Sequence, residues 1–265
     1  MHTPSTEARP SIYYQYEVFK PWLPSAHPAQ MRQQVVIVGS GPAGMVTALE
    51  LARHGVASVV MTSELQFSQG SRAICFTRRS MEILQQVGVA DRMTAGGLPW
   101  RFGNSYYRGQ RVFRMEAPHD ENDRFFPIIN VQQQFLEEYL HDACKANPLI
   151  EFRWGNKVNN VQQKDGYAVL EVDTSEGIYH LESSWVVAAD GGRSALRSAM
   201  NLEMEGTSYE GFFVIADIKI DLPFPTERLA YFDPDWNPGN TILMHREPNG
   251  IWRVDYQLPE GETPE

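Results

Sequence analysis

A glycine-rich loop between a buried strand and a helix constrains the fold of this chain more than any other feature. Residues 35–38 (VVIV) are four consecutive apolar residues, which is typical of a strand covered on both faces of a parallel sheet. The loop GSGPAG follows at 39–44, and a helical pattern extends over about 42–53. A second apolar stretch at 59–61 completes a predicted βαβ unit.

The spacing of the three glycines, G-x-G-x-x-G, predicts a dinucleotide-binding loop in this context. Gly39 permits the tight turn, Gly41 lets the backbone approach a diphosphate, and Gly44 lets the helix pack closely on the strand. Pro42 and Ala43, at the start of the helix, belong to the same predicted site. A diphosphate there faces the free N–H groups and the positive end of the helix.

The same pattern expects an acidic residue at the end of the second strand, where it binds the ribose hydroxyls of the adenosine. Thr62 occupies that position, and the next acid along the chain is Glu64. Two interpretations of Glu64 stay open. It reaches the ribose if the strand extends slightly further, or it is a solvated glutamate of the loop.

A second strand also ends in polar residues and glycines. Residues 186–197 (VVAADGGRSALR) run from an apolar strand into Asp190, Gly191 and Gly192. A carboxylate and two glycines at the end of an apolar strand indicate that something polar is held there. The alternative is that Asp190 caps the helix that follows; a cap and a cofactor ligand do not exclude each other.

The remaining chain mixes helical and strand patterns. We expect helices over about 79–86 and 132–146, and hairpins followed by one buried strand over 150–189. Residues 97–128 are expected to form loops with short strands, and strand-like segments return after 211. The predicted domains are an irregular N-terminal extension (1–31) packed through Tyr13, Tyr14, Tyr16 and Trp22, a nucleotide-binding domain with inserted hairpins (32–205), and the start of a substrate-binding sheet domain, truncated at the chain end (206–265).

Composition excludes several classes of protein. The net charge of −10 argues against nucleic acid or an anionic membrane surface as the main partner. Two cysteines make neither a disulfide framework nor a metal motif, and the histidines lack metal-ligand spacing, so no metal is expected. With no export signal and no long apolar segment, the expected compartment is a reducing cytoplasm.

Three segments together resemble a known family. VVIVGSGPAGMVTALELARHG, SRAICFTRRSMEIL and WVVAADGGRSALR are similar to the single-component FAD-dependent aromatic hydroxylases related to para-hydroxybenzoate hydroxylase and 3-(3-hydroxyphenyl)propionate hydroxylase. The resemblance covers about residues 30–260. It implies an α/β fold, with a Rossmann-like FAD-binding domain containing a parallel sheet and an antiparallel β-sheet substrate domain. It also implies hydroxylation of a phenolic or related aromatic substrate by NAD(P)H and O₂ through a flavin C4a-hydroperoxide.

The resemblance further implies roles for single residues. Arg72 matches an arginine that approaches the flavin nucleotide; the alternative is a solvated surface arginine. Gln133 matches a glutamine that contacts the cofactor at a helix start, although its neighbours Gln132 and Gln134 leave the register open. Asp190 and Gly191 are expected to contact FAD. Phe213, Ile215 and Met244 are predicted to line one wall of the aromatic substrate pocket. The alternative for each of them is that its side chain packs in the protein core.

The family carries a further G-D motif downstream, and the sequence lacks it. The chain is therefore expected to be the N-terminal part of a longer hydroxylase. Two alternatives remain: another FAD-dependent oxidoreductase on the same scaffold, or a non-catalytic truncated fragment. The sequence leaves open which residues are catalytic, and whether the chain forms a homodimer or needs a missing C-terminal segment.

Overall fold

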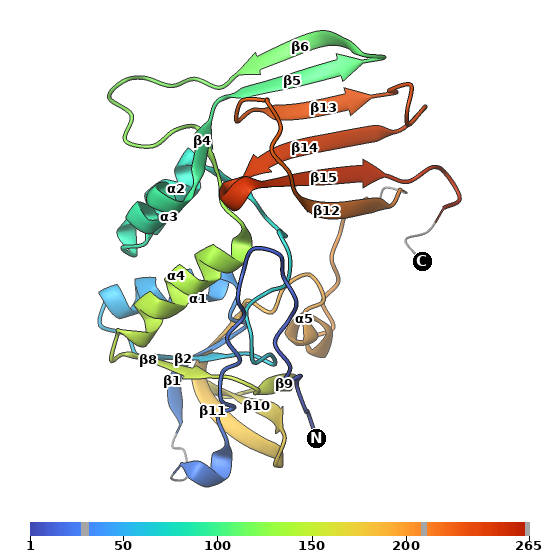
Figure 1. The fold of residues 1–265 in the computed structure, drawn as a ribbon. Coiled ribbons are helices and arrows are strands. Elements are labelled where there is room, and N and C mark those ends of the chain that lie inside the picture. Colours follow the sequence, from blue (N-terminus) through green and yellow to red (C-terminus); the bar gives the residue numbers. More distant parts are fainter. Residues whose placement is uncertain (28–31, 208–210, 263–265) are drawn as a thin grey trace. The chain divides into compact units, whose positions relative to one another are not determined.

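The computed structural model describes residues 1–27, 32–207 and 211–262, and the chain divides into two compact units (Figure 1). Unit 1 comprises residues 1–69, 86–89 and 136–205, and unit 2 comprises the remainder. The units therefore interleave along the chain, whereas the predicted domains are contiguous segments. Which unit binds cofactor and which binds substrate stays a prediction.

Unit 1 is built on a mixed six-stranded sheet. The strand order is β8-β2-β1-β11-β10-β9, with β1 parallel to both β2 and β11, β2 parallel to β8, and β10 antiparallel to its two neighbours. The α/β fold predicted from the sequence is confirmed. The strands are β1 (Gln33–Val38), β2 (Ser58–Met61), β8 (Ile150–Arg153), β9 (Lys157–Lys164), β10 (Tyr167–Thr174) and β11 (Gly177–Ala188).

Strand β11 joins the parallel and antiparallel halves of this sheet. Its first part pairs with β10 and its last part with β1, and Ser183 belongs to both pairings. Helix α1 (Pro42–Arg53) packs on β1, β2 and β8, and helix α5 (Ala195–Ala199) packs on β9. Helix α4 (Gln133–Lys145) has most of its length in this unit. The core consists of apolar side chains from the sheet and α5: Val36, Val38, Val59, Met61, Val158, Leu170, Val172, Leu181 and Leu196.

The first 27 residues, which we call the strap, run along unit 1 (Figure 1, dark blue) and contain one short 3-10 helix, η1 (Pro24–Ala26). Their aromatic side chains hold them in place. The ring of Tyr16 is buried with Leu65, Phe67 and Trp154, and the ring of Phe19 stacks on Trp154 with centroids 4.2 Å apart. Burial of such rings contributes far more to docking than the surface contacts around them.

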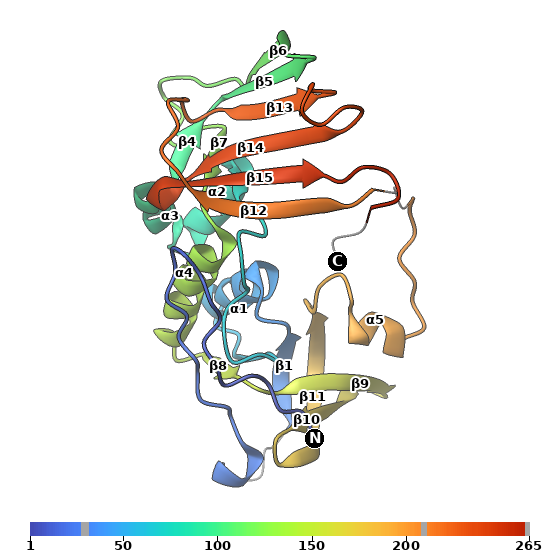
Figure 2. The same cartoon turned by 45° about the vertical axis from the view of Figure 1, so that its right-hand side comes forward.

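Unit 2 contains a six-stranded sheet in the order β12-β15-β14-β13-β5-β6 (Figure 2). All neighbours are antiparallel except β5 and β13. These strands are β5 (Phe102–Tyr107), β6 (Gln110–Glu116), β12 (Phe213–Lys219), β13 (Arg228–Phe232), β14 (Thr241–Glu247) and β15 (Ile251–Gln257).

A smaller sheet and two helices complete unit 2. The small sheet has the order β3-β7-β4, formed by Cys75–Thr77, Ile128–Asn130 and Leu98–Trp100. Helix α2 (Arg78–Gln86) matches the predicted helix, whereas α3 (Ala90–Gly96) was not expected, and η2 (Pro248–Gly250) joins β14 to β15. None of the helices in the described ranges is long and apolar enough to cross a bilayer.

Candidate functional site

The glycine loop of unit 1 connects the end of β1 to the start of α1, as the sequence predicts. Gly39 leaves the strand with a φ of +108°, and its N–H donates to the carbonyl oxygen of Met61 at the end of β2 (2.8 Å). Helix α1 begins at Pro42 with Gly41 as its N-cap, and the cap has no side chain to accept the first N–H groups. Its first turn carries no acidic residue, so the positive end of the helix is available to an anion.

The three glycines of the loop have different surroundings. A Cβ atom on Gly39 would lie 2.1 Å from the carbonyl oxygen of Ala189, and one on Gly44 would lie 2.0 Å from that of Gly39. A Cβ atom on Gly41 would meet no atom of the described residues within 4 Å. Packing within the protein therefore requires two of the glycines. Gly41 instead faces open space, which fits a loop that a diphosphate approaches closely.

A hollow of about 210 Å³ lies beside this loop, at the carboxyl ends of β1, β2 and β11. Ligands of parallel α/β sheets bind at this edge. The lining includes a carboxylate and two cations, so it suits a ligand that carries both hydroxyl and phosphate groups, and the residues present fit one part of a dinucleotide. The polar lining residues are Thr62, Ser63, Asn156, Lys157, Asp190 and Arg193.

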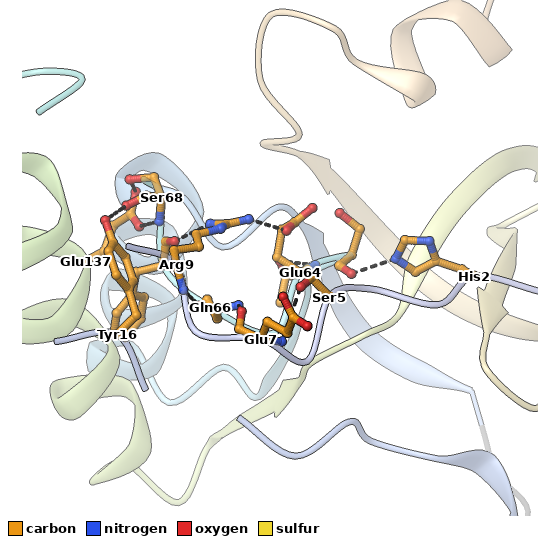
Figure 3. A network of polar contacts seen from close by, with 12 residues as sticks. His2, Ser5, Glu7, Arg9, Tyr16, Glu64, Gln66, Ser68 and Glu137 are labelled. Carbon is orange, nitrogen blue, oxygen red and sulfur yellow. Dashed lines mark hydrogen bonds and ion pairs between the residues drawn. The ribbon is translucent and has the colours of Figure 1, made fainter. Parts of the chain in front are cut away.

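The carboxylate of Glu64 does not point freely into solvent. Strand β2 ends at Met61, so Glu64 lies in the turn that follows it. One carboxylate oxygen of Glu64 pairs with the Arg9 guanidinium of the strap at 2.5 Å, and half of the Glu64 side chain stays exposed (Figure 3). Thr62, which occupies the position expected for the acid, is buried and accepts a long hydrogen bond from the Glu64 N–H (3.4 Å).

Both carboxylate oxygens of Asp190 are used within the chain. One accepts a hydrogen bond from the Ser194 hydroxyl (2.6 Å) and the other from the Leu196 N–H (3.1 Å), at the start of α5. Ser194 is the N-cap of α5 and accepts from the Arg197 N–H. Asp190 therefore shapes the loop and caps the helix, which is the alternative interpretation of this motif; Gly191 beside it has a φ of +81°. Whether Asp190 also contacts a cofactor stays a prediction.

Arg72 and Gln133 lie near each other in unit 2. The side-chain oxygen of Gln133 accepts a hydrogen bond from the N–H of Ala73 (3.3 Å), next to Arg72. The Arg72 carbonyl accepts from the Arg253 guanidinium (2.6 Å), while the Arg72 side chain is exposed. The structure thus brings together the segments that carry these two predicted residues, and their contact with a cofactor stays a prediction.

The three predicted substrate residues do not share one face of the unit 2 sheet. Ile215 on β12 stands opposite Asp255, which stands opposite Leu243, whereas Met244 stands opposite Val254. Residues directly opposite in antiparallel strands point to the same side. Phe213 and Ile215 therefore lie on one face, where both are exposed, and the half-buried Met244 lies on the other.

Several residues of the site were not foreseen from the sequence. Lys157 and Arg193 line the hollow, and Arg9 contacts Glu64 across 55 residues of chain. Arg193 lies inside the quoted motif, next to the predicted residues, but no role was predicted for it. No local pattern marks Lys157 or Arg9, because both reach the site only through tertiary contacts.

Comparison with known proteins adds a family and several relatives. A family model described as FAD binding domain matches residues 32–250. The para-nitrophenol 4-monooxygenase of Pseudomonas sp. strain WBC-3 is 28% identical over 231 residues, which is 84% of this chain and 55% of that enzyme. The 3-(3-hydroxy-phenyl)propionate/3-hydroxycinnamic acid hydroxylase 2 of Burkholderia vietnamiensis strain G4 is 32% identical over 192 residues, which is 71% of this chain and 35% of that enzyme.

Solved structures agree with the fold. The crystal structure of p-nitrophenol 4-monooxygenase from Pseudomonas putida DLL-E4 superposes with a TM-score of 0.80 at 24% identity, covering 88% of this chain and 59% of that one. A flavin-dependent monooxygenase solved with FAD and substrate gives 0.79 at 23% identity, covering 89% and 44%. The chain thus spans about half the length, or less, of these relatives.

Proposed function

The chain belongs to the family of FAD-binding domains, and from that premise we propose that it is the cofactor-binding part of a monooxygenase acting on phenolic or related aromatic rings. The resemblance read from the sequence is confirmed at the level of the family. The observation that carries the proposal is the loop at the end of β1. There the backbone of Gly41 leaves the positive end of α1 accessible to an anion, and the adjacent hollow is lined by both acidic and basic side chains.

Each part of the site has a physical role in this proposal. The backbone at Gly41, Pro42 and Ala43 holds the diphosphate at the positive end of α1, with Lys157 and Arg193 as nearby cations. The free carboxylate oxygen of Glu64 accepts a hydrogen bond from the adenosine ribose. Asp190 fixes the loop that ends β11 by capping α5. Arg72 and Gln133, both in unit 2, stay proposed cofactor contacts on the strength of the resemblance alone. Phe213, Ile215 and Met244 are likewise proposed substrate contacts, but Met244 faces away from the other two, so only one of the two faces can carry the substrate.

FAD, when bound, supplies the redox chemistry: one oxygen atom of O₂ enters the aromatic ring, the other leaves as water, and NAD(P)H provides the two electrons. The use of NAD(P)H is part of the proposal. So is the aromatic substrate, which is supported by the names of the relatives above. We also propose a cytoplasmic location, which suits the two free thiols of Cys75 and Cys144.

The first test is an absorbance spectrum of the purified protein with and without FAD. We expect a flavin band with vibrational structure, or saturable binding on titration. Oxidation of NAD(P)H is then measured with 4-nitrophenol and with 3-(3-hydroxyphenyl)propionate, and a hydroxylated product is identified. A folded protein that binds no FAD overturns the proposal. NAD(P)H oxidation or flavin reduction without a hydroxylated aromatic product supports another flavin-dependent oxidoreductase.

A further inference from the structure

We propose that the strap is a working part of the cofactor site, with Arg9 as a positioning residue for Glu64 and His2 as a support for the neighbouring turn. This inference rests on the proposed FAD site in unit 1. It assigns a role to a segment that lies before residue 32, where the match to the family model begins.

Arg9 makes three contacts with the segment that follows β2. Its guanidinium pairs with one carboxylate oxygen of Glu64 and donates to the carbonyl oxygen of Phe67, and its backbone N–H donates to the side-chain oxygen of Gln66 (2.9 Å). The side-chain amide of Gln66 donates in return to the carbonyl oxygen of Glu7 (2.8 Å). Figure 3 shows the Arg9 side chain pointing at Glu64. The ion pair is thus anchored by further bonds on both sides.

The N-terminal end of the strap contacts one wall of the hollow. The His2 ring nitrogen lies 2.7 Å from the carbonyl oxygen of Ser63, and the His2 backbone N–H donates to Asp173 on β10 (3.0 Å). Ser63 lines the hollow directly. The strap therefore contacts the turn after β2 at Ser63, Glu64 and Gln66.

A second part of the strap contacts the neighbouring segment, which follows β8. The Trp22 N–H donates to the carbonyl oxygen of Trp154 (2.9 Å), and the Trp22 carbonyl accepts from the side-chain amide of Asn156 (2.9 Å). Asn156 lines the hollow together with Lys157. The Arg153 guanidinium lies over the Trp22 ring, 4.0 Å from its centroid. The Asn156 N–H donates to the Thr62 carbonyl oxygen (2.8 Å), so docking of the strap fixes two paired segments that both border the hollow.

The geometry of Glu64 shows why this fixation matters for binding. Its side chain is half exposed, so without a partner it samples several rotamers. Arg9 holds one oxygen and leaves the other for a ribose hydroxyl. When the acceptor side chain is already ordered, ligand binding does not bear the free-energy cost of ordering it. Because linkage is reciprocal, bound FAD also holds the strap in its docked position.

The test measures FAD affinity of the full chain by quenching of flavin fluorescence. We expect Arg9→Met to raise the Kd about three- to tenfold, the effect of ordering one further side chain, whereas Arg9→Lys retains most of the affinity. Tyr14→Phe is the matched control, because it removes a strap contact to Glu138 on α4 (2.8 Å) that is not part of the turn. Its Kd should rise less than that of Arg9→Met, because the turn keeps all its contacts.

A double-mutant cycle separates positioning from general support. If Arg9 acts through Glu64, then Arg9→Met combined with Glu64→Ala binds FAD no more weakly than Glu64→Ala alone. Additive losses overturn the proposal. A measurement on the unmodified chain does not depend on the folding of variants: FAD should slow chymotryptic cleavage after Tyr14 and Phe19, and an unchanged cleavage rate contradicts the linkage.

The two proposals fail in different ways. If the unmodified, folded chain binds no FAD, the proposed function fails. If it binds FAD and the Kd is the same for the unmodified chain, Arg9→Met and Tyr14→Phe, then only the role of the strap fails.

Discussion

A Cβ atom on Gly44 would lie 2.0 Å from the carbonyl oxygen of Gly39, so helix α1 packs on its own entry loop more closely than a side chain permits. Gly39 is confined in the same way by Ala189 at the end of β11. The two residues thus tie the loop to α1 and β11, while Gly41 between them faces open space. The motif combines two packing requirements with one ligand-binding position.

The first prediction uses this difference. Gly44→Ala should lower the free energy of unfolding by about 1–3 kcal/mol, as overpacking does. Gly41→Ala should leave it within about 0.5 kcal/mol, because Gly41 has a φ of −68° that alanine adopts readily. It should nevertheless weaken FAD binding at least about tenfold, since the methyl group occupies the path of the diphosphate. Urea unfolding and FAD titration check both values. Unchanged affinity in Gly41→Ala would place the diphosphate elsewhere.

The second prediction concerns the cap of α5. Asp190→Ala removes both acceptors for the Ser194 hydroxyl and the Leu196 N–H, and should destabilise unit 1 by about 1–2 kcal/mol. Ser194→Ala interrupts the same network, so the two effects should not add. Urea unfolding of both single variants and the double variant measures this coupling. Strict additivity would contradict the shared cap.

The third prediction concerns Glu247, a buried carboxyl of unit 2. Burial, and secondly the nearby Asp217, raise the pKa of Glu247 to about 8, and the Arg253 guanidinium, Gln132 and Ser71 offset only part of this. The folded state therefore keeps a proton that the unfolded state loses above about pH 4.5. Stability should fall as the pH rises from about 4.5 to 8, by at most about 1.4 kcal/mol per pH unit from this group.

Glu247→Gln is the variant that tests this origin, because it keeps the shape and removes the titration. Its stability relative to the unmodified chain should increase from pH 5 to pH 8 in urea unfolding. A constant difference across that range would show that Glu247 titrates normally.

The fourth prediction concerns His141 on α4. Its ring packs among Phe19, Phe67, Phe152 and Trp154, and burial lowers the pKa of His141 to about 4. In the unfolded chain His141 binds a proton near pH 6.5, whereas in the folded chain it binds one only near pH 4. The contribution of His141 to the free energy of unfolding therefore falls as the pH drops from 6.5 towards 4. Histidine ring signals in NMR should show no titration of His141 above pH 5. A midpoint near 6.5 would mean that the ring is solvated.

The parts of the fold predicted well are those specified by neighbouring residues. Helix α1 has the predicted bounds Pro42–Arg53, and α4 (Gln133–Lys145) differs from the expected helix by one residue at each end. In both cases a helical apolar pattern follows a recognisable start. Strands β1 and β2 were equally clear, because four apolar residues precede the glycine loop and three more follow the helix.

Long-range pairings could not be predicted in the same way. Strand β5 pairs in parallel with β13, matching Gly103 to Arg228, and nothing local to either segment indicates this partner. The face occupied by Met244 depends on the register of β14 and β15, which alternation alone does not set. The ion pair between Arg9 and Glu64 is a third case, because no local sequence pattern around either residue predicts the other as its partner.

The docking of the strap has a consequence for the order in which the protein is made. The strap is translated before the residues to which it binds, because Trp154, Asn156 and Asp173 follow at least 130 residues later. At the usual rate of synthesis, this delay is roughly 7 to 30 s. During that time Tyr16, Phe19 and Trp22 leave the ribosome without the surface that will cover them. The strap therefore docks only after these later residues have been made, although it precedes them along the chain.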